Sequence, residues 1–74
     1  MYKYKNEISW CRLGEEVYII NELNGKICII KGMRAKVFLD ISDEERVWEE
    51  EEKILLDDLV EKGVIVKRIR ANHY

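Results

Sequence analysis

The only histidine is the first residue to weigh for chemistry, because a nucleophile needs a suitable base beside it. His73 lies next to the end of this 74-residue chain, where chain ends fray and seldom hold catalytic geometry. Gly25, Gly32 and Gly63 are dispersed, so no glycine-rich loop that could hold a phosphate is formed. The sequence therefore predicts a protein that is not an enzyme.

Two groups of residues carry donor atoms that metal ions use. The run Glu49–Glu52 is rich in carboxylates, but consecutive side chains on a helix point in different directions, and no calcium-loop pattern is present. Cys11 and Cys28 are the only cysteines, and they do not have the spacing of metal ligands. We expect no metal or other cofactor, and two reduced, half-buried thiols in the cytoplasm.

The charge balance argues against nucleic acid as a partner. The chain has 13 Lys and Arg residues against 15 Asp and Glu residues, a formal charge of -2, so no long-range positive field attracts DNA or RNA. The basic segment Lys67–Arg70 is expected to be a solvated terminus. No apolar run approaches the roughly 20 residues that cross a bilayer, and no signal-peptide pattern opens the chain. We expect one cytoplasmic domain over residues 1–74, without membrane contact.

Three β-strands are predicted in the first half of the chain. Ile8–Leu13 alternates apolar and polar residues until Gly14 interrupts it. Val17–Leu23 and Lys26–Lys31 are rich in β-branched and aromatic residues. Between them, Asn24-Gly25 is a dipeptide that favours a two-residue type I′ turn. The pattern predicts an antiparallel β-meander.

The two-residue turn sets the expected register of the second and third strands. Ile20 should face Ile29, and Ile19 should face Ile30. Isoleucines then lie on both faces of the sheet, although a small sheet with one solvated face normally alternates apolar with polar residues. Either another element covers the second face or the face is used for contact, and a homodimer is one candidate.

The residues after the sheet favour helices and one further extended segment. Met33–Leu39 should form a short helix that begins after Gly32. Near the end of the chain, Val64–Ile69 is apolar and β-branched, which predicts a last short strand or an extended tail.

A second helix is predicted over Asp43–Lys62. Ser42 and Glu45 fit the capping box, in which each side chain accepts from the other residue's backbone amide, and Gly63 supplies the expected stop. The glutamates in the middle interrupt the apolar stripe. The helix therefore bends or breaks around Glu50, or its first half projects into solvent.

The order of these elements resembles the PqqD-like peptide chaperones, also called RiPP precursor peptide recognition elements, over most of the chain. The resemblance is carried by a tryptophan before the hairpin, the hairpin strands, an alanine with an apolar-aromatic short helix, and a leucine-x-x-x-glycine helix end. These residues are Trp10, Val17–Asn21, Gly25–Ile30, Ala35, Val37–Leu39 and Leu59–Ile65. The family has three helices, so the middle one is here either missing or fused with the helix that starts at Asp43.

The resemblance implies an α+β fold in which a three-stranded antiparallel β-meander is followed by two or three helices, in a winged-helix-like arrangement. It implies a non-catalytic module that captures the leader of a ribosomally synthesised precursor peptide by β-strand addition. The module would present this leader to a modifying enzyme, such as a radical S-adenosylmethionine enzyme. Carried over by position, the peptide-binding residues are Lys26, Ile27, Cys28, Ile29, Ile30, Lys31, Ile54, Leu55, Asp58, Leu59 and Lys62.

The acidic second helix predicts that the leader carries Lys or Arg among its apolar anchors, with binding weakened by salt. A winged-helix transcriptional regulator is an alternative, although DNA contact needs a basic recognition helix, and positive charge comes only from Arg34, Lys36 and the basic terminus. Another alternative is an inhibitor or assembly subunit whose acidic helix docks on a basic protein surface.

Overall fold

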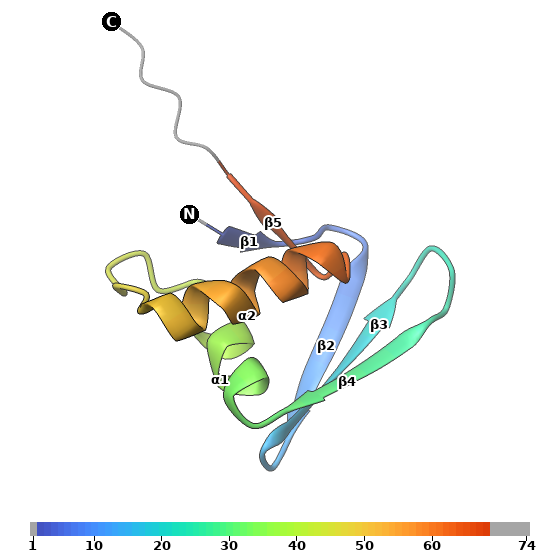
Figure 1. Ribbon diagram of the computed structural model, residues 1–74. Helices are drawn as coiled ribbons and strands as arrows, with labels where there is room; N and C mark the ends of the chain where they lie inside the picture. The colour runs from blue at the N-terminus through green and yellow to red at the C-terminus, as the bar shows by residue number, and fades with distance from the viewer. Residues whose placement is uncertain (1, 69–74) are drawn as a thin grey trace, which may run out of the picture.

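The computed structural model describes residues 2–68 and has an α+β architecture (Figure 1). Five strands and two helices follow one another along the described chain. They are β1 (Tyr2–Tyr4), β2 (Ile8–Leu13), β3 (Glu16–Asn21), β4 (Ile27–Lys31), α1 (Met33–Asp40), α2 (Glu50–Glu61) and β5 (Ile65–Lys67).

The strands form two antiparallel sheets. One has three strands in the order β2-β3-β4, in which Ile19 lies between Trp10 and Cys28. The other joins β1 to β5, the two ends of the described chain, with Lys3 opposite Val66. The last segment is therefore a strand over Ile65–Lys67, and β1 was not predicted. Of the other residues in the predicted segment Val64–Ile69, Val64 and Arg68 are not part of the strand, and Ile69 lies outside the described residues.

The hairpin between β3 and β4 differs from its predicted register by two residues. Ile20 lies opposite Ile27, not Ile29, and β3 ends at Asn21. The side-chain carbonyl oxygen of Asn21 accepts from the backbone N–H of Leu23 at 2.9 Å, and its main-chain oxygen accepts from Gly25 N–H at 2.8 Å. This Asx-type loop replaces the type I′ turn, because that turn needs positive φ at two central residues and only glycines have it among the described residues.

A register shift of two residues leaves every side chain on its predicted face, because side chains alternate with a period of two. Isoleucines consequently occupy both faces of the sheet, as the sequence indicated: Ile19 and Ile30 are buried, whereas Ile20 and Ile27 are exposed.

The first helix is confirmed, and the predicted start of the second is wrong. α2 begins at Glu50, with a capping box between Glu49 and Glu52 in place of the one predicted at Ser42 and Glu45. The helix does not extend back from Glu50 to Asp43, which agrees with the predicted alternative of a break around Glu50. Residues 41–49 form an irregular connection instead.

Arg46 explains why this connection is not helical. Its guanidinium pairs with Asp40 of α1 at 3.1 Å and with Glu52 of α2, and it lies 4.3 Å from the centre of the Trp48 ring. A continuous helix from residue 43 would place Arg46 and Glu52 on different faces, since they are six residues apart. Contacts with both helices and with Trp48 outweigh the local preference for helix over residues 43–49.

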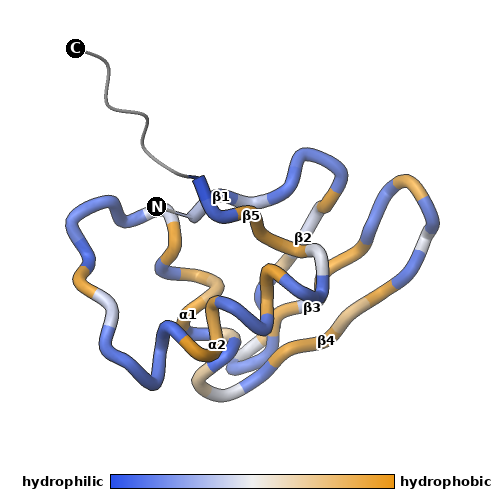
Figure 2. Tube along the Cα trace, turned by 45° about the horizontal axis from the view of Figure 1, so that its top comes forward, coloured by the Kyte–Doolittle hydropathy of each residue, from blue (hydrophilic) through white to orange (hydrophobic). Residues whose placement is uncertain are grey.

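The core lies between the inner face of the three-stranded sheet, the two helices and β5. Hydrophobic stretches of β3, β4, β5 and α2 contribute to it (Figure 2). Its fully buried side chains are Phe38, Ile19, Leu56, Leu59, Ile65, Val17 and Val37. Tyr4 ties β1 to this core, because its hydroxyl donates to the Phe38 carbonyl at 2.6 Å and its ring packs on the Phe38 ring.

Candidate functional site

β4 is an edge strand with an unpaired side. Within the described residues it pairs only with β3. The backbone N–H of Asn21 donates to the Lys26 carbonyl at 2.8 Å, so Lys26, Cys28 and Ile30 direct their backbone groups toward β3, because hydrogen-bonded positions alternate along an antiparallel strand. The backbone N–H and C=O groups of Ile27, Ile29 and Lys31 therefore point to the open edge.

The side chains of β4 alternate between the two faces of the sheet. Ile30 is buried against the helices and Cys28 is half-buried, whereas Ile27 and Ile29 are 66% and 53% exposed on the opposite face. Of the aliphatic residues predicted to bind a peptide in β4, Ile30 thus serves the core. Ile27 and Ile29 stand beside the open edge on the face away from the helices.

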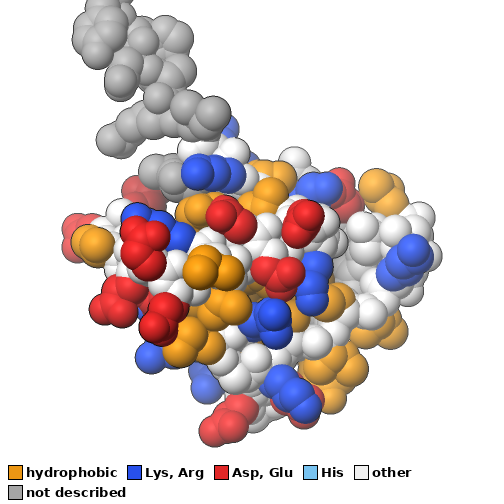
Figure 3. Space-filling view, viewed as in Figure 1, with side chains coloured by type: hydrophobic (Ala, Val, Ile, Leu, Met, Phe, Trp, Pro, Cys, Tyr) orange, Lys and Arg blue, Asp and Glu red, His pale blue; other side chains and the backbone are white. Residues whose placement is uncertain are grey.

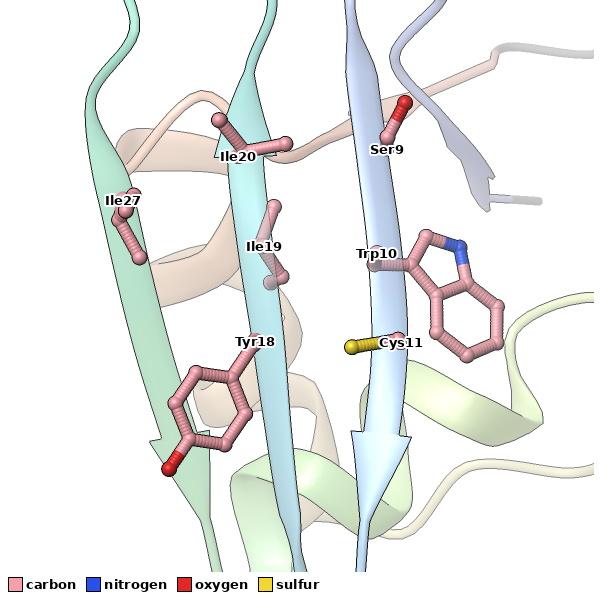
Figure 4. A pocket seen from close by; sticks show the side chains of 7 residues that line it. All are labelled: Ser9, Trp10, Cys11, Tyr18, Ile19, Ile20 and Ile27. Atoms are coloured by element: carbon pink, nitrogen blue, oxygen red, sulfur yellow. The ribbon is translucent and has the colours of Figure 1, made fainter.

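The outer face of the sheet continues this apolar surface across all three strands. Ile20 and Leu13 are 40% and 59% exposed. A shallow hollow of about 300 Å³ is lined by Ser9, Trp10, Cys11, Tyr18, Ile19, Ile20 and Ile27 (Figure 4). The described residues leave this face open to solvent, so the second apolar face expected from the sequence is present and uncovered.

The predicted wall from α2 contains residues of three kinds. Leu59 is fully buried and Leu55 half-buried, while Ile54 is 68% exposed. Asp58 is paired with Arg34 Nε at 3.1 Å and with Lys62 Nζ at 3.7 Å. Leu59 therefore supports the wall from the core, and Ile54, Leu55, Asp58 and Lys62 provide its accessible surface.

The end of α2 and the start of β4 meet around a second hollow, of about 390 Å³. Ile27 and Cys28 line it from β4, Lys26 from directly before that strand, and Lys62 from directly after α2. Its other lining residues are Ile8, Ile19, Asn21, Asn24, Gly63 and Val64. Ile54 lies about two helical turns before Lys62. Of the predicted wall residues, Lys62 lines this hollow, whereas Ile54, Leu55, Asp58 and Leu59 do not. The structure thus brings the start of the predicted binding strand to the end of the predicted wall only.

Within residues 2–68, His, Cys, Asp and Glu side chains form no group of three or more that could hold a metal ion. Cys11 and Cys28 are free thiols, and His73 lies outside the described residues. No helix in the described chain is long and apolar enough to cross a membrane.

Arg34 and Asn21 contribute to this site, and neither was predicted to do so. Arg34 was considered only for DNA contact, yet its partner is Asp58 of α2. Asn21 positions the start of β4 through its side-chain hydrogen bonds. An Asn directly before a loop is a signal for an Asx turn, whereas the Arg34 partner is 24 residues away and has no local signal.

Comparison of the chain with protein-family models, curated proteins and solved structures finds no match.

Proposed function

We propose that this protein is a non-catalytic module that binds a peptide as an added strand along β4. The observation that carries the proposal is the open edge of β4, where Ile27, Ile29 and Lys31 offer unpaired backbone groups beside exposed isoleucine side chains. Backbone pairing along an edge supplies affinity, and side-chain pockets beside it supply specificity.

The bound peptide in this proposal is the leader of a ribosomally synthesised precursor, held for a modifying enzyme such as a radical S-adenosylmethionine enzyme in the cytoplasm. This part rests on the resemblance to the PqqD-like chaperones and their winged-helix-like arrangement. The helix wall suits the same use, because Ile54 and Leu55 offer apolar surface on the side of α2 that Asp58 ties to Arg34. α2 itself begins with three glutamates, which weighs against a DNA-reading helix.

Amide hydrogen exchange tests the proposal residue by residue. The neighbouring genes are first searched for a short precursor peptide, and the probe is a synthetic copy of its leader. In the unbound protein, the amides of Ile27 and Ile29 should exchange quickly, and those of Cys28 and Ile30 slowly, because only the latter pair with β3. Binding should protect the Ile27 and Ile29 amides.

The amides of Cys28 and Ile30 are the internal control, since they are already hydrogen-bonded in the unbound protein. A leader that binds without protecting Ile27 and Ile29 would contradict strand addition at β4. Chemical-shift changes confined to residues outside Lys26–Lys31 and Ile54–Lys62 would contradict the site as a whole.

A further inference from the structure

We infer that the strand accepted by β4 is acidic, with aliphatic residues alternating with Asp or Glu. This inference rests on the proposed function and specifies its ligand. The charge inferred for the bound peptide is opposite to the one expected from the sequence, where the acidic second helix indicated a basic leader.

Cations flank β4 at both ends. Lys26 and Lys62 line the same hollow at the start of the strand. Lys31 ends the strand, and Arg34 follows it in the first turn of α1. All four side chains are exposed, and in the middle of the face shown in Figure 3 Lys and Arg side chains lie among Asp and Glu side chains. An anionic segment laid along β4 therefore meets positive charge at each end.

The carboxylates of α2 offset only part of this charge at β4. Asp58 is paired with Arg34 and Lys62, Glu61 lies beside Lys62 in the chain, and Glu16 lies opposite Lys31 in β3. The four cations therefore outnumber these three carboxylates by one. The acidic first turn lies at the other end of the helix, twelve residues and about 18 Å from Lys62. That separation is roughly twice the Debye length of about 8 Å at physiological ionic strength, so screening removes most of its influence.

The faces of β4 determine where the acidic residues belong. In an added strand, alternate side chains point to opposite faces. Those on the outer face extend the row of Ile27, Ile29 and Lys31, in which the two exposed isoleucines favour aliphatic residues. Those on the inner face lie toward Lys26 and Lys62, which favours carboxylates. The matching ligand is a segment in which every second residue is acidic.

Three synthetic peptides test this pattern by fluorescence anisotropy with the full chain. The first alternates valine with glutamate, the second alternates valine with lysine, and the third has the composition of the first with its valines and glutamates in separate blocks. The valine-glutamate peptide should bind most tightly and protect the Ile27 and Ile29 amides. Its affinity should fall as salt is raised.

A charge-reversal variant tests the role of the cations. Lys26→Glu should weaken binding of the valine-glutamate peptide by about two- to fivefold for each ion pair lost. Lys3→Glu makes the same charge change on β1 and should leave the affinity nearly unchanged. Both lysines are exposed, so both variants should fold. Circular dichroism of each variant checks that they do.

The outcomes separate the inference from the proposed function. If the valine-lysine peptide binds as tightly and protects the same amides, the acidic preference is overturned while strand addition stands. If the block peptide binds equally well, the alternation is overturned. If no peptide, the encoded leader included, protects Ile27 and Ile29, both the inference and the proposed function fail.

Discussion

Nε of Arg34 lies 3.1 Å from Oδ2 of Asp58, so an ion pair joins the residues directly after β4 to the second half of α2. Both side chains are partly exposed, at 49% and 32%, and an ion pair of this kind contributes about 0.2–1 kcal/mol to stability. Its larger consequence is electrostatic, because Asp58 offsets part of the positive charge that Arg34 places directly after β4.

Asp58→Asn should strengthen the binding of an acidic strand, because it removes this carboxylate and leaves Arg34 and Lys62 without their partner. We expect an affinity gain of about two- to fivefold for the valine-glutamate peptide, measured by anisotropy. Asp57→Asn is the matched control, since Asp57 is the neighbouring carboxylate on the side of α2 toward Tyr2. Equal gains in affinity in the two variants would show that the change in net charge, and not the position of Asp58, causes the effect.

Asn21→Ala should destabilise the protein by about 1 kcal/mol, because the Asn21 side chain closes the loop before β4 through two backbone amides. Urea denaturation measures the free energy of unfolding. Asn6→Ala changes an exposed asparagine outside this loop and serves as the control. A loss as large in Asn6→Ala would contradict the role given to the Asn21 loop.

Stability should fall at alkaline pH through Tyr4. Burial, followed by the negative charge of Asp40, raises the pKa of Tyr4 to about 12, above the ordinary value of about 10. A raised pKa gives a contribution that is fully present below pH ~10 and is lost as the pH rises through the folded value of about 12.

Tyr4→Phe tests this assignment by thermal unfolding across that range. The variant should lose about 1 kcal/mol near neutral pH, because the Phe38 carbonyl loses its donor, and its alkaline decline should be shallower. Tyr18→Phe, on the outer face of the sheet, is the comparison. If Tyr18→Phe reduced the alkaline loss of stability more than Tyr4→Phe does, the assignment of that loss to Tyr4 would be contradicted.

Stability should also fall at acid pH through Glu52. Hydrogen bonding from Arg46, and then from the backbone N–H of Glu49, lowers the pKa of Glu52. A lowered pKa gives a contribution that is present above the ordinary value of about 4.3 and is lost as the pH falls through the folded value.

Glu52→Gln removes this charge while glutamine can still serve the capping box. The variant should have a lower unfolding temperature at neutral pH and a smaller decline in acid, measured by circular dichroism. Glu51→Gln removes an exposed carboxylate one residue earlier. A neutral-pH loss of the same size in Glu51→Gln would contradict the importance of the Arg46 contacts.

The outer sheet face is too small to hold a tight homodimer by itself. Three strands about 4.8 Å apart and six residues long, at about 3.3 Å per residue, cover roughly 280 Å² in projection. Even twice that area is below the ~800 Å² that each partner contributes to a standard interface. Sedimentation velocity should therefore find a monomer at micromolar concentration, and a dimer that persists after Ile20→Ser would use another surface.

Local sequence patterns determined the types of most elements. The short helix was predicted over Met33–Leu39 and observed over Met33–Asp40, because its residues and the preceding glycine act within one or two turns. The strand at Ile8–Leu13 was predicted with the bounds that it has. Two isoleucine-bearing faces also followed from alternation alone, and a register error of two residues could not change them.

Only the tertiary structure decided how these elements meet. The start of α2 depends on Arg46 reaching Asp40 and Glu52, and the β1–β5 pair joins segments more than sixty residues apart. The ion pair between Arg34 and Asp58 joins residues that are 24 positions apart. Local preferences act between near neighbours in the chain, whereas these contacts form between distant residues and exist only once the chain is folded.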